Sequence, residues 1–133
     1  IKILLCANDI LVNSLQRESS VIIQKSLKEG FALTVSEALY KQTPVVASNV
    51  GGIPLQVING RTGFLHEPND VKGFSNSIIK LLKNNELREK LGKNGKKHVI
   101  KNYYHNTTLK KEYRPSIRRM APPTIISEFF PLT

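Results

Sequence analysis

The chain has 133 residues, and its 20 lysines and arginines outnumber its 10 aspartates and glutamates, which gives a formal net charge of +10 at pH 7. This length supports one domain with a modest hydrophobic core. The sequence shows no signal segment and no apolar run of about 20 residues, the length that a membrane-spanning helix requires. The single cysteine, Cys6, excludes an internal disulfide and favours a cytoplasmic location, where we expect a buried, inert thiol.

The positive charge is compatible with binding to nucleic acid, to anionic membrane surfaces or to anionic substrates. The basic residues are spread over the segment 80–111 rather than gathered in one block, as is typical of solvated helix faces. His66, His98 and His105 lie far apart, so we predict no metal site. We attribute the charge to solubility and to attraction of an anionic substrate, and a basic nucleic-acid-binding module stays open as an alternative.

Short apolar runs at 1–7, 21–23 and 44–47 predict buried strands. A helix is predicted after Asn8 and Asp9, with an apolar side made of Ile10, Leu11, Val12 and Leu15. Continuous apolar runs favour parallel strands that are covered on both faces. The alternation of strands and helices therefore predicts the α/β class, with a Rossmann-like doubly wound parallel sheet.

Two carboxylates, Glu29 and Glu37, stand eight positions apart between the second and third predicted strands. Gly30 allows a bend, and Thr34 and Glu37 have the T-x-x-E spacing of a capping box, which predicts a helix at about 35–41. The unpaired amides and the dipole of such a helix start suit a phosphate. Carboxylates on either side would accept hydrogen bonds from the hydroxyls of sugar rings. In the alternative interpretation, Glu37 only caps the helix and Glu29 is a solvated loop residue.

A second loop follows the strand at 44–47. Gly51 and Gly52 fit either a close approach to a substrate or a turn into the segment 53–58. The segment 59–65 predicts a tight turn and a short edge strand. Because ligands gather beyond the carboxyl ends of parallel strands, we expect the acidic loop and the glycine pair to meet at one edge of the sheet.

Two helices should follow. The first is capped at 68–70 and carries the apolar residues Phe74, Ile78, Ile79, Leu81 and Leu82. The second begins near Glu86 and places Leu87, Leu91 and Val99 on its buried side. We therefore predict one domain at 1–104. The basic segment 105–133 contains four prolines and no apolar period, and it fits either a disordered tail or an altered reading frame.

Taken in order, several motifs resemble the donor-binding half of retaining glycosyltransferases of the glycogen-synthase-like group, family four, which have the GT-B fold. The matching stretches are 25–39, which contains Glu-Gly-Phe-Ala-Leu-Thr-Val-Ser-Glu, then 43–54, 59–65 and 67–70. Within the group, the stretches 15–17, 21–26 and 52–57 look most like trehalose synthases and trehalose phosphorylases. The resemblance covers residues 1–104.

The resemblance implies that the chain is an incomplete C-terminal half of a hexosyltransferase. Such an enzyme transfers glucose from ADP-, UDP- or GDP-glucose to a small sugar acceptor, in trehalose synthesis or phosphorolysis, without a cofactor or metal. It also implies an N-terminal GT-B domain as partner, and a homodimer of the parent enzyme stays open. We expect the fragment alone to be inactive. A non-catalytic partner that retains the fold is the other alternative.

By the family's pattern, Glu29 is the catalytic residue, which binds the hydroxyls of the transferred sugar and stabilises an oxocarbenium-like transition state. The donor sugar and phosphate are assigned to Gly30, Phe31, Ala32, Leu33 and Thr34. Glu37 is assigned to the ribose, and Lys25 and Gly51 are secondary candidates. Ala32 stands where most relatives have glycine, so that an added methyl group next to the sugar would impair turnover. The absence of an evident Ser-His or Cys-His pair agrees with retention without an enzyme nucleophile.

Overall fold

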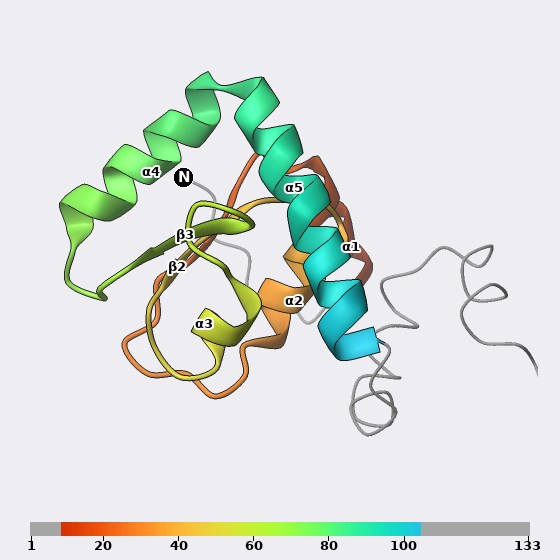
Figure 1. Cartoon of the computed structure of the whole chain (residues 1–133), viewed down its shortest axis with the longest axis horizontal. Helices are drawn as coiled ribbons and strands as arrows, with labels where there is room; N and C mark the ends of the chain where they lie inside the picture. The colour runs from red at the N-terminus through yellow and green to blue at the C-terminus, as the bar shows by residue number, and fades with distance from the viewer. Residues whose placement is uncertain (1–8, 105–133) are drawn as a thin grey trace, which may run out of the picture.

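A parallel sheet of three short strands forms the centre of the computed structural model, which describes residues 9–104 (Figure 1). The strands are β1 (Ile22–Gln24), β2 (Val45–Ser48) and β3 (Gly63–His66), in that order across the sheet. Ile22 lies opposite Val45, and Val45 lies opposite Gly63. The predicted strands near 21–23, 44–47 and 62–65 and their parallel pairing are confirmed.

The described part of the chain contains five α-helices and one π-helical turn. They are α1 (Asp9–Glu18), α2 (Leu33–Tyr40), α3 (Ile53–Gln56), α4 (Val71–Lys83), α5 (Asn85–Val99) and the π-helix η1 (Ile100–Tyr104). None of the helices within residues 9–104 is both long enough and apolar enough to cross a membrane. The predicted first strand, Cys6 and the tail at 105–133 lie outside the described residues.

The starts of α4 and α5 follow directly from their cap residues. The Asp70 carboxylate accepts a hydrogen bond from the Gly73 amide at 2.9 Å, and the Asn84 side chain accepts one from the Leu87 amide at 2.9 Å. A short polar side chain before a helix satisfies one of the amides that have no intrahelical partner. The prediction of a cap at 68–70 is confirmed, and α5 begins one residue before the predicted start.

Alternate residues of β2 face two separate hydrophobic clusters. Val45 and Ala47 pack with α2, α3 and η1, whereas Val46 packs with Phe74 and Leu81 of α4. Because successive side chains of a strand point to opposite faces, this division shows that the sheet is covered on both sides. Helix α5 contributes to both clusters, since Leu91 belongs to one and Val99 to the other.

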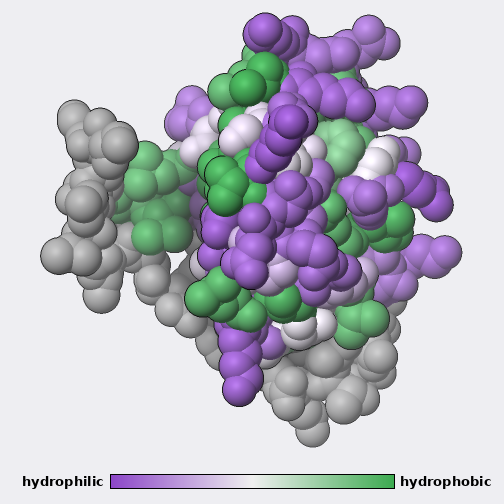
Figure 2. Space-filling model, turned by 90° about the vertical axis from the view of Figure 1, so that its left-hand side faces the viewer, coloured by the Kyte–Doolittle hydropathy of each residue, from purple (hydrophilic) through white to green (hydrophobic). Residues whose placement is uncertain are grey.

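Helix α4 buries only part of its apolar surface. Of the apolar residues that the predicted helix carries, Phe74 and Leu81 are buried, but Ile79 and Leu82 are 47% and 53% exposed. At 100° per residue, these two lie on the flank away from Phe74 and Leu81, where the sheet does not reach. Figure 2 faces the side on which α4 lies and shows hydrophobic residues scattered among hydrophilic ones. The apolar side expected for α1 is likewise exposed at Ile10 and Leu15.

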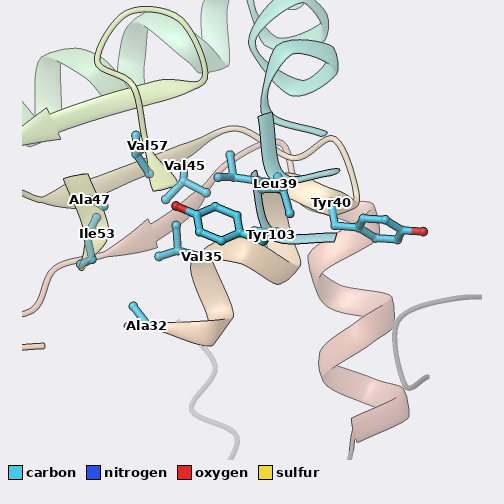
Figure 3. Packing of buried hydrophobic residues seen from close by; sticks show 11 residues of the cluster. Ala32, Val35, Leu39, Tyr40, Val45, Ala47, Ile53, Val57 and Tyr103 are labelled. Carbon is cyan, nitrogen blue, oxygen red and sulfur yellow. The ribbon is translucent and has the colours of Figure 1, made fainter. Parts of the chain in front are cut away.

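Tyr103 anchors η1 in the larger hydrophobic cluster, the one that contains Val45 and Ala47. Figure 3 shows its ring among side chains from α2, β2 and α3. Its ring meets that of Phe31 edge-on, with centroids 5.4 Å apart, and its hydroxyl donates to the Leu55 carbonyl at 2.7 Å. Burial raises the pKa of Tyr103 above the ordinary 10.0. The hydroxyl therefore stays protonated in the folded chain over the neutral range.

We expect Tyr103→Phe to lower the free energy of unfolding by about 0.5–1.5 kcal/mol at neutral pH, the usual contribution of one hydrogen bond. The effect stays small because the ring is kept and the Leu55 carbonyl still accepts from His98 Nε2 at 3.0 Å. The folded-state pKa is raised, so the hydroxyl's contribution is fully present below pH 10.0 and is lost as pH rises through the raised pKa. Urea denaturation of both proteins at neutral and strongly alkaline pH tests this, and a difference that grows with pH would contradict it.

Candidate functional site

The loop after β1 and the turn after β2 meet at the carboxyl edge of the sheet. The Gly52 amide donates to the Gly30 carbonyl at 2.7 Å. Gly51 has φ of +56°, and a Cβ atom at this position would collide with the backbone carbonyl of Glu29. The turn interpretation of the glycine pair is confirmed, because the pair leads directly into α3. The close approach that the pair allows is to the backbone of the first loop, and an approach to a substrate stays a prediction.

Helix α2 begins at Leu33, two residues earlier than predicted, and no side chain caps it. Ala32 precedes it in the left-handed conformation, with φ of 56° and ψ of 71°. This residue turns the chain sharply, so Thr34 already lies inside the first turn and its hydroxyl donates to Gln24 Oε1 at 3.2 Å instead. The capping box predicted for Thr34 and Glu37 is therefore wrong.

The start of α2 combines an uncapped first turn with a strained residue. Its first turn carries no acidic side chain and no side-chain cap, so the N–H groups there are suited to an external anion. The Ala32 side chain is buried in the larger hydrophobic cluster. A left-handed alanine costs about 1–2 kcal/mol, so this residue strains the backbone directly before α2.

A chain of side-chain hydrogen bonds ends on Glu29. Thr34 donates to Gln24, Gln24 Nε2 donates to Ser26 Oγ at 2.9 Å, and Ser26 Oγ donates to Glu29 Oε2 at 2.9 Å. Gln24 and Ser26 each accept one hydrogen bond and donate the next, and the last acceptor is the Glu29 carboxylate. The network joins the end of β1 to the start of α2 and holds the Glu29 side chain between them.

Glu37 belongs to a second network, on the side of α2 that faces α1. Gln16 Nε2 donates to Glu37 Oε2 at 3.4 Å, and Lys41 Nζ donates to Gln16 Oε1. Burial lowers the pKa of Lys41 below 10.5, the nearby Glu37 carboxylate raises it, and Arg17 lowers it further. Gln16 therefore bridges an ammonium group and a carboxylate, and it fixes the orientation of Glu37.

Both carboxylates are connected to α2, but through different networks. Thr34 in the first turn of α2 is linked to Glu29 through the first network. Thr34 and Glu37 are three residues apart, so these two side chains lie on the same face of α2. Lys25 is placed elsewhere, with its ammonium 5.9 Å from the ring centroid of Phe74 on α4. Within residues 9–104, no three histidine, cysteine or acidic side chains come close enough to hold a metal ion.

Three glutamines position the site, and the motif analysis did not single them out. Gln24 and Gln16 orient the two carboxylates. Gln56 is fully buried, its Nε2 donates to the Phe31 carbonyl, and its Oε1 accepts from Ser36 at 2.5 Å, which ties α3 to the start of α2. Gln24 could have been recognised from its position at the end of the apolar run of β1. A polar side chain at that point of a buried strand needs a hydrogen-bond partner.

Comparison with known proteins agrees with this architecture. The family model described as "Glycosyl transferases group 1" matches residues 3–98. Trehalose synthase of Thermococcus litoralis is 45% identical over 92 residues, which are 69% of this chain and 22% of that protein. Trehalose phosphorylase of Grifola frondosa is 36% identical over 92 residues, or 13% of its length. The chain thus spans about a fifth or less of the length of these relatives.

A solved structure also supports the assignment of the fold. The C-terminal domain of a glycosyl transferase group 1 family protein from Francisella tularensis superimposes with a TM-score of 0.66 at 28% identity, over 77% of this chain and 52% of that domain. The parallel sheet, its helices on both faces and the family match over residues 3–98 lead to one conclusion. The chain belongs to the group 1 glycosyl transferases, and it has the α/β fold of part of their C-terminal domain.

Proposed function

We propose that the chain forms the donor-binding part of a retaining glycosyltransferase that moves glucose from a nucleotide sugar to a sugar acceptor, in trehalose synthesis or phosphorolysis. The arrangement that carries this proposal is the uncapped start of α2, with Glu29 linked to its first turn through Ser26, Gln24 and Thr34 and Glu37 on the helix itself. The likeness to trehalose synthase and trehalose phosphorylase supports the choice of sugar.

The chemistry assigned to the site follows from these positions. The N–H groups of the first turn of α2 would bind the diphosphate, because they combine hydrogen-bond donors with the positive end of the helix dipole. Glu29 would accept hydrogen bonds from the transferred sugar and stabilise positive charge on its ring in the transition state. Glu37 would accept hydrogen bonds from the ribose. Preorganisation by Gln24 and Gln16 supports these roles, since neither carboxylate then has to reorient during the reaction.

Other parts of the proposal concern the whole enzyme. The acceptor site would lie in an N-terminal GT-B domain, so the chain alone would bind donor weakly and transfer nothing. A dimeric parent enzyme, a cytoplasmic location and the choice among ADP-, UDP- and GDP-glucose stay predictions. No cofactor is assigned beyond the nucleotide sugar itself.

We expect the 133-residue chain to bind ADP-, UDP- or GDP-glucose weakly but specifically, with amide chemical-shift changes in ¹H–¹⁵N spectra centred on residues 29–37. The corresponding nucleoside, which lacks the diphosphate, should produce no such changes because the anion is missing. Glu37→Gln should weaken binding of the nucleotide sugar, whereas Glu86→Gln, at an exposed position of α5, should not. Shifts that avoid residues 29–37, or sugar transfer by the chain alone, would contradict the proposal.

A further inference from the structure

A second polar pocket lies between the loop that enters β3 and the last turns of α5. Its volume is about 400 Å³, and its walls include Arg61, Lys97, His98 and Lys101. The loop enters β3 at the amino end of that strand, whereas Glu29 and the start of α2 lie at the carboxyl end of the sheet. The pocket is therefore separate from the candidate donor site. We propose that it binds the phosphoryl group of a small molecule, and this proposal does not depend on the proposed function.

The charge of the pocket is one-sided. Arg61, Lys97 and Lys101 each bring a positive charge, and no carboxylate lines the walls. Within residues 9–104, none of these three side chains forms an ion pair with an aspartate or glutamate. The neighbouring Lys96 differs, because its ammonium lies 5.1 Å from the ring centroid of Tyr40. An anion would supply the charge that the pocket lacks.

The two lysines of the pocket are exposed and lie close together on α5 and η1. Lys97 and Lys101 are four residues apart, so they are neighbours on one helical face and repel each other. Together with Arg61 from the loop before β3, they concentrate three positive charges at the pocket.

Hydrogen bonds hold the walls in place. Asn94 Nδ2 donates to the Arg61 carbonyl at 3.1 Å, which ties the loop to α5. Thr62 Oγ1 accepts from the Ile58 amide at 2.8 Å, which closes the loop on itself. His98 Nε2 lies 3.0 Å from the Leu55 carbonyl. The pocket is thus built from elements that are fixed to each other, although its charged groups come from distant parts of the sequence.

The shape and the donor set indicate the chemical class of the ligand. A volume of about 400 Å³ falls within the usual range of small-molecule sites, about 300–1,000 Å³. A guanidinium group offers paired N–H donors that match phosphate oxygens, and two ammonium groups add point charges. A phosphoryl group, free or attached to a small sugar, satisfies both features.

The test uses the whole 133-residue chain at constant ionic strength, with inorganic phosphate, glucose 6-phosphate and glucose as probes. We expect both phosphate compounds, but not glucose, to shift the amide signals of residues 58–62 and 94–102. The double variant Lys97→Gln/Lys101→Gln should weaken this binding at least tenfold. Lys90→Gln/Lys93→Gln removes the same charge from α5 outside the pocket and should leave the affinity within about twofold.

Each outcome decides the proposal. Tighter binding of glucose 6-phosphate than of phosphate identifies a sugar phosphate as the ligand, and equal binding identifies the phosphoryl group alone. Equal losses in the two double variants would mean non-specific attraction to a basic surface and would overturn the proposal. So would the absence of shifts in these segments, or equal binding of glucose. Signals of residues 58–62 and 94–102 report on this pocket and those of residues 29–37 on the donor site, which separates the two tests, and thermal midpoints of all variants confirm that they fold.

Discussion

Alanine in place of Gly51 should lower the free energy of unfolding by about 2–5 kcal/mol. Two costs add together. A left-handed alanine costs about 1–2 kcal/mol, and the new Cβ atom would overlap the Glu29 carbonyl, where overpacking typically costs about 1–3 kcal/mol. Urea denaturation of the chain measures the loss.

Gly60→Ala is the matched control, because Gly60 also has a positive φ, +76°, but no atom lies within 4 Å of the position of its Cβ. This variant should lose only the conformational part, about 1–2 kcal/mol. The difference between the two variants measures the contact between the two loops. Equal losses would show that the turn after β2 does not hold Glu29 in place.

Glu29→Gln is expected to reduce the turnover number by about 10²–10³-fold in an enzyme that contains this chain as its donor-binding part. A suitable enzyme is a hybrid of the Thermococcus litoralis trehalose synthase in which the 92 aligned residues are replaced by those of this chain. The amide keeps the size of the side chain but removes the negative charge that would stabilise the sugar ring in the transition state. The KM for the donor should change little, because the interaction is made mainly in the transition state.

Glu86→Gln in the same hybrid serves as the control for loss of one carboxylate at an exposed site, and its turnover should equal that of the unsubstituted hybrid. Ser26→Ala should lie between the two, since it removes the hydrogen bond that orients Glu29 but keeps the charge. Unchanged turnover in Glu29→Gln would favour the other alternative, a non-catalytic partner that retains the fold.

Helix caps that depend on adjacent residues could be predicted from the sequence. Asp70 and Asn84 precede their helices, and each accepts a hydrogen bond from an amide three residues later. Such a contact depends on few other parts of the chain. The buried side of α2 was predictable from helical spacing. Val35, Ala38 and Leu39 are apolar residues spaced to lie on one side of a helix, and all three are fully buried.

The start of α2 was not predictable from spacing alone. The T-x-x-E pattern at Thr34 and Glu37 fits a capping box, but the left-handed Ala32 lets the helix begin at Leu33. Both side chains are then drawn to partners outside the helix, Gln24 and Gln16, which lie 10 and 21 residues away. Local propensity was overridden by tertiary contacts that a single sequence does not reveal.

The apolar faces of α1 and α4 show the same limit. The sequence indicates which residues are apolar, but burial depends on how far the neighbouring sheet extends. Phe74 faces the sheet, whereas Ile79 and Leu82 lie on another side of α4 and are exposed. The convergence of Glu29 and Gly51 was predictable because parallel strands fix the edge at which their loops emerge.

The outer edge of β1 sets a condition on solution experiments with this chain. Among the described residues, β1 is hydrogen-bonded to β2 on one side only, and Ile23 is 48% exposed. A strand edge with unfilled N–H and C=O groups recruits further strands, including those of other copies, by adding to the sheet. Self-association would rise with protein concentration, so ligand titrations of this chain need a dilution series to separate binding from aggregation.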